Sequence, residues 1–172
     1  MIIATTDFLE RPYKVPNQNE SPDFENFLAM AEQKILINLF GYAFYKELTD
    51  AIEDSGVLDP IYQELLDGAE YVYSGVTYKY NGLVDLLKPA IYAEWINQGS
   101  YKFTNIGWVQ NSAQEKAVTI DSEQFRVQYV NEFAEKVGHG IMVNTLWGFL
   151  NVNDDDYPDL VFKSPKTGNR FL

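Results

Sequence analysis

Apolar residues recur at helical spacing in several separate stretches of this chain, and glycine or proline interrupts the pattern between them. The first stretch starts at Ser21-Pro22-Asp23, where serine can cap a helix, proline needs no amide partner and aspartate suits the positive helix end. Gly41 ends it, and a second helix through Ile52 follows so closely that the two form an antiparallel hairpin. The whole succession predicts a mainly α protein, a helical bundle of about four to five helices.

A small β-hairpin insertion is predicted between two of the helices. A short helix that opens at Asp59-Pro60 ends just before a stretch rich in tyrosine and valine. Strand-forming residues on both sides of Ser74-Gly75, a turn dipeptide, predict a hairpin over residues 69–80. Its four tyrosines are explained better by packing between the strands than by stacking on single-stranded nucleic acid, because Lys79 is nearly the only cation there.

The two remaining helical patterns each contain a helix breaker. The pattern over residues 83–99 includes Pro89, so either that helix kinks or it starts near Lys88. The last long pattern meets Gly138 and Gly140 before it resumes, and each glycine costs about 1 kcal/mol in a helix interior. We expect a bend or a break at these two glycines.

The helical core is expected to carry arms at both ends. Residues 1–20 are predicted as an extended N-terminal arm, residues 21–150 as a single helical domain, and residues 151–172 as an extended C-terminal tail. An irregular loop over residues 100–120 is either functional or a surface loop, and the tail either packs on a neighbouring subunit or is a disordered end. Aromatic and apolar residues of the loop and the tail are the predicted interface: Tyr101, Phe103, Ile106, Trp108, Tyr157, Leu160, Phe162 and Phe171.

The charge balance limits the classes of partner. The 25 acidic and 13 basic residues give a formal net charge of -12, which argues against binding to nucleic acid or to an anionic membrane. The N-terminus lacks the pattern of a signal peptide, and no apolar run is long enough to span a bilayer. No membrane partner is therefore predicted.

The residue types that usually carry chemistry are scarce. The absence of cysteine excludes a disulfide scaffold and a thiolate zinc site, and the one histidine, His139, is expected in a core, cap or interface role. The spacing of Asn151, Asn153 and Asp155 begins like a calcium loop, but Phe162 stands where the loop needs glutamate. We therefore predict no catalytic residues, no cofactor and no metal, and the protein is not expected to be an enzyme.

A series of short segments, in this order, resembles head–tail connector (adaptor) proteins of tailed phages and prophages of gut bacteria. The resemblance covers residues 22–150 and rests on structural residues rather than on a catalytic signature. The segments are Phe40-Gly41-Tyr42, Tyr45-Lys46-Glu47-Leu48, Leu65 to Tyr71, Gly75 to Tyr80, Gly82-Leu83, Lys88-Pro89-Ala90, Tyr92-Ala93, Trp95 and Asn105 to Gln110.

The resemblance implies a virion structural protein that is assembled in the host cytoplasm. Such proteins are helical bundles that form an oligomeric ring, often of twelve copies, beneath the portal protein. The ring extends the DNA channel and docks tail components. DNA would pass nearby without specific binding, and an acidic subunit suits this because it repels phosphates. The tail after Leu150 is longer than the family pattern, which leaves its partner open.

A different class of function is also compatible with the composition. A small acidic regulatory or inhibitor module that binds a basic protein partner would share the same charge balance. The two hypotheses differ in what they predict for the purified protein. A connector forms a ring or joins one on the portal, whereas the module stays a monomer or dimer and binds its partner in a salt-sensitive way.

Overall fold

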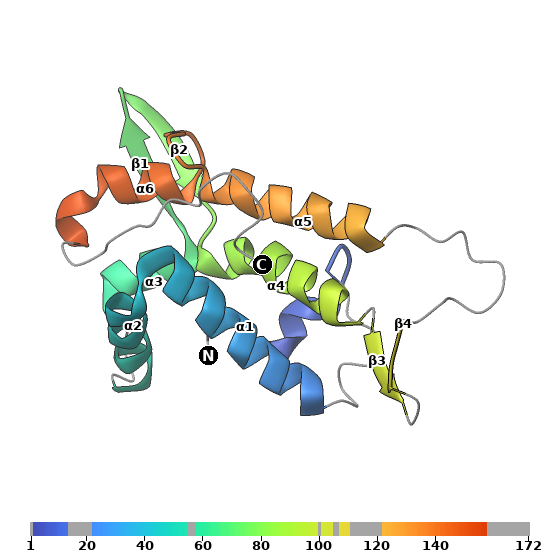
Figure 1. Cartoon of the computed structure of the whole chain (residues 1–172). Helices are drawn as coiled ribbons and strands as arrows, with labels where there is room; N and C mark the ends of the chain where they lie inside the picture. Colours follow the sequence, from blue (N-terminus) through green and yellow to red (C-terminus); the bar gives the residue numbers. More distant parts are fainter. Residues whose placement is uncertain are drawn as a thin grey trace.

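The computed structural model describes residues 2–13, 22–54, 58–99, 101–104, 107–110 and 122–157. In these ranges it confirms the predicted helical bundle with a small β-hairpin (Figure 1). The α-helices are α1 (Pro22–Phe40), α2 (Tyr42–Asp54), α3 (Pro60–Asp67), α4 (Leu83–Gly99), α5 (Ser122–Val137) and α6 (Leu146–Val152). Two short 3-10 helices are η1 (Thr5–Phe8) and η3 (Asp154–Asp156), and the strands are β1 (Ala69–Tyr73), β2 (Val76–Tyr80), β3 (Tyr101–Thr104) and β4 (Gly107–Gln110).

Helix α4 lies at the centre of the bundle and contacts α1, α3 and α5. The helix runs from Leu83 through Pro89, which excludes the predicted alternative of a start near Lys88. Proline lacks the N–H that would bond the carbonyl of Asp85 four residues earlier. The Lys136 ammonium of α5 donates to that carbonyl oxygen at 3.1 Å and to the Asp85 carboxylate at 2.9 Å. Lys136 therefore compensates for the missing backbone bond and ties α5 to α4.

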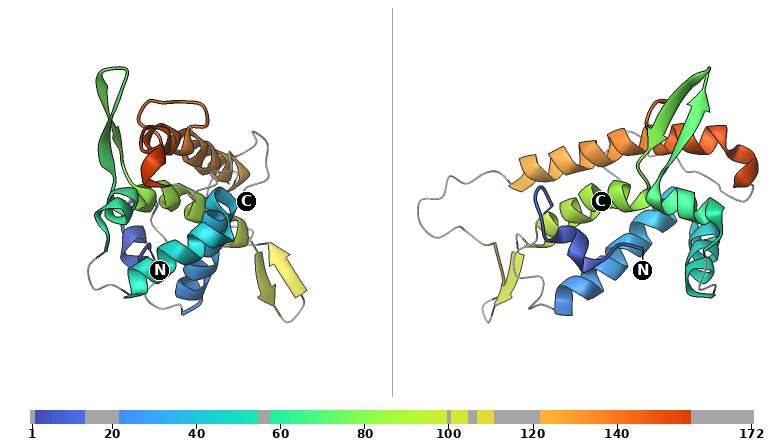
Figure 2. Two further views of the ribbon diagram at one scale, coloured as in Figure 1. Left: turned by 90° about the vertical axis from the view of Figure 1, so that its left-hand side faces the viewer. Right: turned by 180° about the vertical axis from the view of Figure 1, so that it is seen from behind.

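The glycines after α5 separate it from α6, as expected. Gly138 has a φ of 64°, a left-handed conformation that ends the helix. Helix α6 then begins after Thr145, whose hydroxyl oxygen accepts a hydrogen bond from the Gly148 N–H at 3.1 Å. The segment between them, called here the α5–α6 loop (residues 138–145), runs beside the β1–β2 hairpin (Figure 2).

The N-terminal segment, predicted as an extended arm over residues 1–20, instead forms η1 and packs on the bundle over residues 2–13. Ile3 and Phe8 are 1% and 0% exposed, and the Phe8 ring contacts Phe24 edge-on with centroids 5.6 Å apart. The buried carboxylate of Glu32 accepts hydrogen bonds from the Ile2 N–H at 2.9 Å and the Ile3 N–H at 2.8 Å. These contacts join the segment to α1. Residues 14–20 of the predicted arm lie outside the described residues.

The segment predicted as an irregular loop contains a second hairpin. Strands β3 and β4 pair antiparallel, with Phe103 opposite Trp108 and Lys102 opposite Val109. The prediction erred because it looked for helical period and took glycine and asparagine as signs of a loop. These residues also separate short strands. The rest of the loop, residues 111–120, lies outside the described residues.

The two hairpins project from opposite ends of the helical body. Figure 1 shows β1–β2 rising above α6, while β3–β4 extends from the far end of α4, and both views of Figure 2 agree. In the described part of the chain, each hairpin is a separate two-stranded sheet. No helix in that part is both long enough and apolar enough to cross a membrane.

Candidate assembly surface

The base of the β1–β2 hairpin is fixed against α6 by aromatic packing. The ring of Tyr80 stacks on Phe149 with centroids 4.8 Å apart, and the ring of Tyr71 meets Phe149 edge-on at 6.2 Å. The Tyr71 hydroxyl donates to the Met142 carbonyl oxygen at 2.8 Å. A Cβ atom on Gly148 would lie 2.5 Å from both of these oxygens, so only glycine fits at this point of α6. The hairpin therefore has a defined direction relative to the bundle.

The tip of the hairpin is a tight turn whose shape follows from two residues. Ser74 and Gly75 have φ values of 51° and 79°, as a type I′ turn requires at its two central positions. This turn matches the natural twist of the strands and sets the register, in which Tyr73 lies opposite Val76. This turn forms the outer end of the hairpin, which lies beyond the part that packs against α6.

The α5–α6 loop contacts the outer side of β2. The side-chain oxygen of Asn144 accepts a hydrogen bond from the Lys79 N–H at 3.0 Å. Asn144 has a φ of 52°, a conformation that asparagine tolerates better than most residues. Together with the Tyr71 hydroxyl bond, this contact holds the loop and the hairpin side by side.

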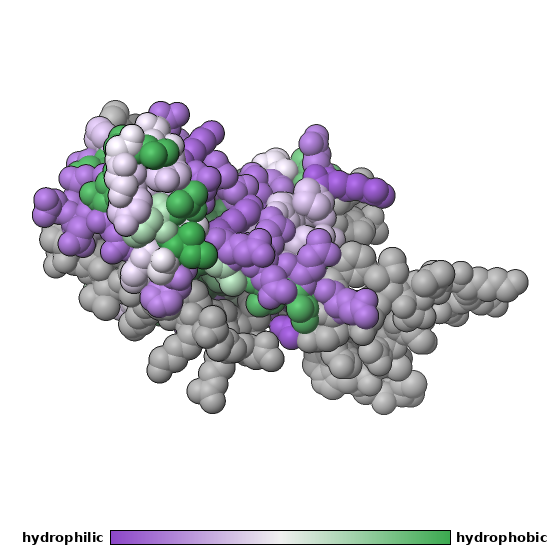
Figure 3. All heavy atoms as spheres, turned by 90° about the horizontal axis from the view of Figure 1, so that it is seen from above, coloured by the Kyte–Doolittle hydropathy of each residue, from purple (hydrophilic) through white to green (hydrophobic). Residues whose placement is uncertain are grey.

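Apolar side chains of the hairpin and of the α5–α6 loop are exposed around this end of the molecule. Their exposed fractions range from 41% to 58%. Figure 3 shows apolar residues gathered around the hairpin among polar surroundings. We call this set the assembly surface, and it consists of Val72, Tyr73, Val76, Ile141 and Val143.

The assembly surface lies in a nearly neutral region of a strongly acidic chain. Residues 68–80 contain one acid, Glu70, and one base, Lys79, and residues 138–149 contain His139 as their single ionisable side chain. His139 is exposed and its ring meets Trp147 edge-on at 4.5 Å, so it is not a core residue. Two copies of a chain with a net charge of -12 repel one another, and they do so least where the local charge is zero.

Acidic side chains concentrate instead on α2, α3 and η3. These three elements contain a single basic residue, Lys46. Their exposed carboxylates are Glu47, Asp50, Glu53, Asp59, Glu64, Asp67 and Asp154 to Asp156. Within the described residues, no group of three or more histidine, aspartate or glutamate side chains is arranged to hold a metal ion.

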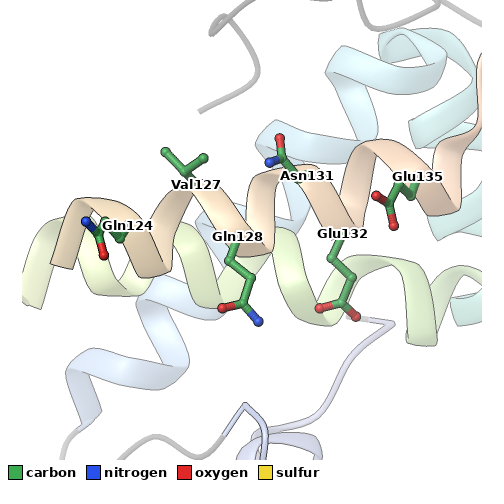
Figure 4. Close-up of a pocket in the computed structure, with 6 residues that line it drawn as sticks. All are labelled: Gln124, Val127, Gln128, Asn131, Glu132 and Glu135. Atoms are coloured by element: carbon green, nitrogen blue, oxygen red, sulfur yellow. The ribbon is translucent and has the colours of Figure 1, made fainter. Parts of the chain in front are cut away.

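A shallow recess runs along the solvent side of α5 (Figure 4). Three amide and two carboxylate side chains line it, and the Glu132 carboxylate accepts a hydrogen bond from the Tyr13 hydroxyl. Burial and this bond raise the pKa of Tyr13 well above its usual range, so Tyr13 remains a donor at all ordinary pH values. The lining residues are Gln124, Val127, Gln128, Asn131, Glu132 and Glu135.

The predicted interface residues fall into three groups. The backbones of Tyr101, Phe103 and Trp108 belong to β3 and β4. Tyr157 is 6% exposed, and its hydroxyl donates to the Ile61 carbonyl oxygen at 2.8 Å, so it packs inside its own subunit. The remaining four, Ile106, Leu160, Phe162 and Phe171, lie outside the described residues.

Sequence reasoning did not single out the assembly surface. The hairpin was predicted, but its tyrosines were assigned to packing between the strands, and its valines were given no role at the surface. The register could have identified one member of the surface, because side chains alternate between the two faces of a hairpin. Tyr71, Tyr78 and Tyr80 share the face that meets α6, whereas Val72 points to the other face and is exposed.

The residues at the calcium-loop spacing lie at the C-terminal end of α6. Asn151 belongs to α6, where its side-chain amide donates to the Trp147 carbonyl oxygen at 2.8 Å. The Asn153 amide likewise donates to the Phe149 carbonyl oxygen at 2.9 Å. Both side chains serve the end of the helix.

The fold defines a mainly α protein with two projecting hairpins and exposed apolar side chains at one of them. The chain belongs to a family of unknown function (DUF6712), whose model matches residues 36–170. No curated protein and no solved structure matched the chain in the comparisons.

Proposed function

We propose that this protein is a virion structural protein of a tailed phage, a subunit of a head–tail connector (adaptor) ring. The ring would continue the DNA channel of the portal protein and dock tail components. In this role the subunit must bind copies of itself, the portal and the next tail protein, while DNA slides past it.

The observation that carries the proposal is where the residues of the family resemblance lie in the fold. Gly41 forms the joint between α1 and α2, with a φ of 87°. Gly68 and Gly82 approach each other's flanking backbone at the base of the hairpin, where neither could bear a Cβ atom. Pro89 lies at the centre of α4. The resemblance is therefore carried by the residues that build this particular bundle and hairpin.

The electrostatics support a channel subunit. A ring of chains that each carry a net charge of -12 repels DNA phosphates, so the duplex can slide instead of adhering. A closed ring also needs two different contact surfaces on each subunit. The hairpins at the two ends of the body supply elements that can form such surfaces.

Native mass spectrometry of the purified chain tests the proposal, alone at several concentrations and with the portal protein encoded in the same genome. A large closed oligomer, or one that appears only with the portal, is the expected result. A chain that stays monomeric and does not bind the portal protein at any concentration would contradict the proposal.

The exposed carboxylates of α2, α3 and η3 favour one other candidate, the small acidic module that binds a basic protein. That function predicts a stable monomer or dimer and binding to its partner that weakens steeply with salt. The connector ring predicts much weaker salt dependence for contacts between its own subunits, because the assembly surface is nearly uncharged.

A further inference from the structure

The two hairpins share an unusual property, since each is a two-stranded sheet with no third strand within the described residues. A strand at the edge of a sheet presents N–H and C=O groups that can pair with another chain. A two-stranded ribbon has two such edges and is only marginally stable by itself. Each hairpin is thus a site where a further strand can be added.

The structure distinguishes the two edges of the β1–β2 hairpin. Bonded and non-bonded residue pairs alternate along an antiparallel ladder. Tyr73 and Val76 close the two-residue turn as a bonded pair, so Val72 with Thr77 and Glu70 with Lys79 are non-bonded pairs whose backbone groups point outward. On β2 the Lys79 N–H is occupied by Asn144.

The outer edge of β1 is therefore the open one. Its outward backbone groups belong to Glu70 and Val72, and no hydrogen bond joins them to another residue in the described part of the chain. The Val72 side chain is 58% exposed. This edge carries an acid at Glu70, and the β3–β4 hairpin at the other end of the molecule carries Lys102 and no acid.

We infer that the open edge of β1 in one copy pairs with the β3–β4 hairpin of the next copy, forming a four-stranded sheet between subunits. The elements lie at opposite ends of the body, so the contact is head-to-tail and can propagate around a ring. Glu70 and Lys102 bring opposite charges to it, while the backbone bonds supply affinity. The inference rests on the proposed ring and names its contact.

A pair of proline variants tests the edge. Val72→Pro removes an outward N–H from the open edge of β1, whereas Thr77→Pro removes the equivalent group from the opposite position on β2. Neither change breaks a bond between β1 and β2, because residues 72 and 77 form a non-bonded pair. We expect Val72→Pro to raise the concentration of half-assembly by about tenfold and Thr77→Pro to change it by less than about twofold. Equal assembly of both variants would overturn the inference.

Exchanging the charges of Glu70 and Lys102 tests whether β3–β4 is the partner of β1. This test does not depend on whether the hairpin tolerates proline. Glu70→Lys should weaken assembly, and adding Lys102→Glu in the same chain should restore it, since opposite charges then face each other again. Circular dichroism and thermal unfolding of each variant confirm that the monomer is folded. If the double variant assembles no better than Glu70→Lys alone, β3–β4 is not the partner.

The experiment separates the inference from the proposed function. A wild-type chain that forms a ring, together with a Val72→Pro chain that forms the same ring equally well, would overturn the strand pairing and leave the connector role intact. A wild-type chain that never assembles, with or without portal, would overturn both.

Discussion

The N-terminal segment and the tip of the β1–β2 hairpin both carry apolar side chains near an end of a secondary-structure element, yet they have opposite fates. Ile3 and Phe8 of the segment are almost completely buried, whereas Val72 and Val76 of the hairpin are at least half exposed. The segment is held because its amides find a buried acceptor, the Glu32 carboxylate. The hairpin tip extends past the helices and finds no comparable partner among the described residues.

This difference in burial indicates which of the two segments can contact another subunit. A segment whose side chains and amides are satisfied within its own subunit gains nothing by crossing to another copy, unless it first loses those contacts. An exposed apolar surface with an open strand edge gains from burial on a partner, by about 25 cal/mol for each Å² of apolar area. We therefore propose the hairpin, and not the described part of the N-terminal segment, as the element that takes part in assembly.

The largest expected effect separates these two regions by stability. Phe8→Ala should lower the free energy of unfolding by about 3–5 kcal/mol, because it leaves a cavity against Phe24. Val76→Ala should change it by less than about 0.5 kcal/mol, because the side chain is half exposed. Urea denaturation measures both. A cost below about 1 kcal/mol for Phe8→Ala would mean that the segment behaves as a free arm after all.

A substitution that disturbs the base of the hairpin should lower stability more than a substitution at its tip. Gly148→Ala should cost about 1–3 kcal/mol, since the new methyl group would collide with the Met142 carbonyl and the Tyr71 hydroxyl. Gly75→Ala meets no atom within 4 Å and has only its left-handed backbone, with a φ of 79°, to strain. It should cost about 1–2 kcal/mol. Thermal unfolding of both variants compares the losses of stability. A larger loss for Gly75→Ala than for Gly148→Ala would contradict the claim that the base of the hairpin holds it to the bundle.

The attachment of the N-terminal segment should depend on pH. Burial raises the pKa of Glu32 above its ordinary value of 4.5, and the Ile2 and Ile3 amides offset part of this rise. An acid with a raised pKa in the folded state stabilises the fold most below its unfolded pKa, and this contribution is lost as pH rises through the folded pKa.

Glu32→Gln should therefore cost about 1–2 kcal/mol at low pH, because the amide keeps one acceptor oxygen where the carboxyl group has two. The difference in stability between wild type and variant should shrink as pH increases from about 4 toward neutrality. Thermal unfolding at a series of pH values measures it. A difference that grows with pH would show that burial does not dominate the pKa of Glu32.

The elements of the fold were predictable because their signals are local. Periodic apolar residues, the Ser74-Gly75 turn and the breakers at Gly41 and Gly138 determine where helices and strands start and stop. The continuity of α4 was left open, because it depends on Lys136, a residue distant in sequence that bonds the carbonyl freed by Pro89.

The candidate surface could not be derived in the same way, because exposure is a tertiary property. Nothing local distinguishes Phe8, which is buried beside Phe24, from Tyr73, which is 41% exposed. The Glu32 carboxylate that holds Ile2 and Ile3 is separated from them by about thirty residues, and only the fold brings them together. The second hairpin was missed since its strands are only four residues long.

Hydrogen–deuterium exchange of the free and the assembled protein tests the central claim most directly. The account predicts that the outward-pointing amides of Glu70 and Val72, on the open edge of β1, become protected when the ring forms. Amides of Ile2 and Ile3 should be protected equally in both states, because Glu32 already binds them in the monomer. New protection confined to the N-terminal segment, with β1 unchanged, would contradict the account.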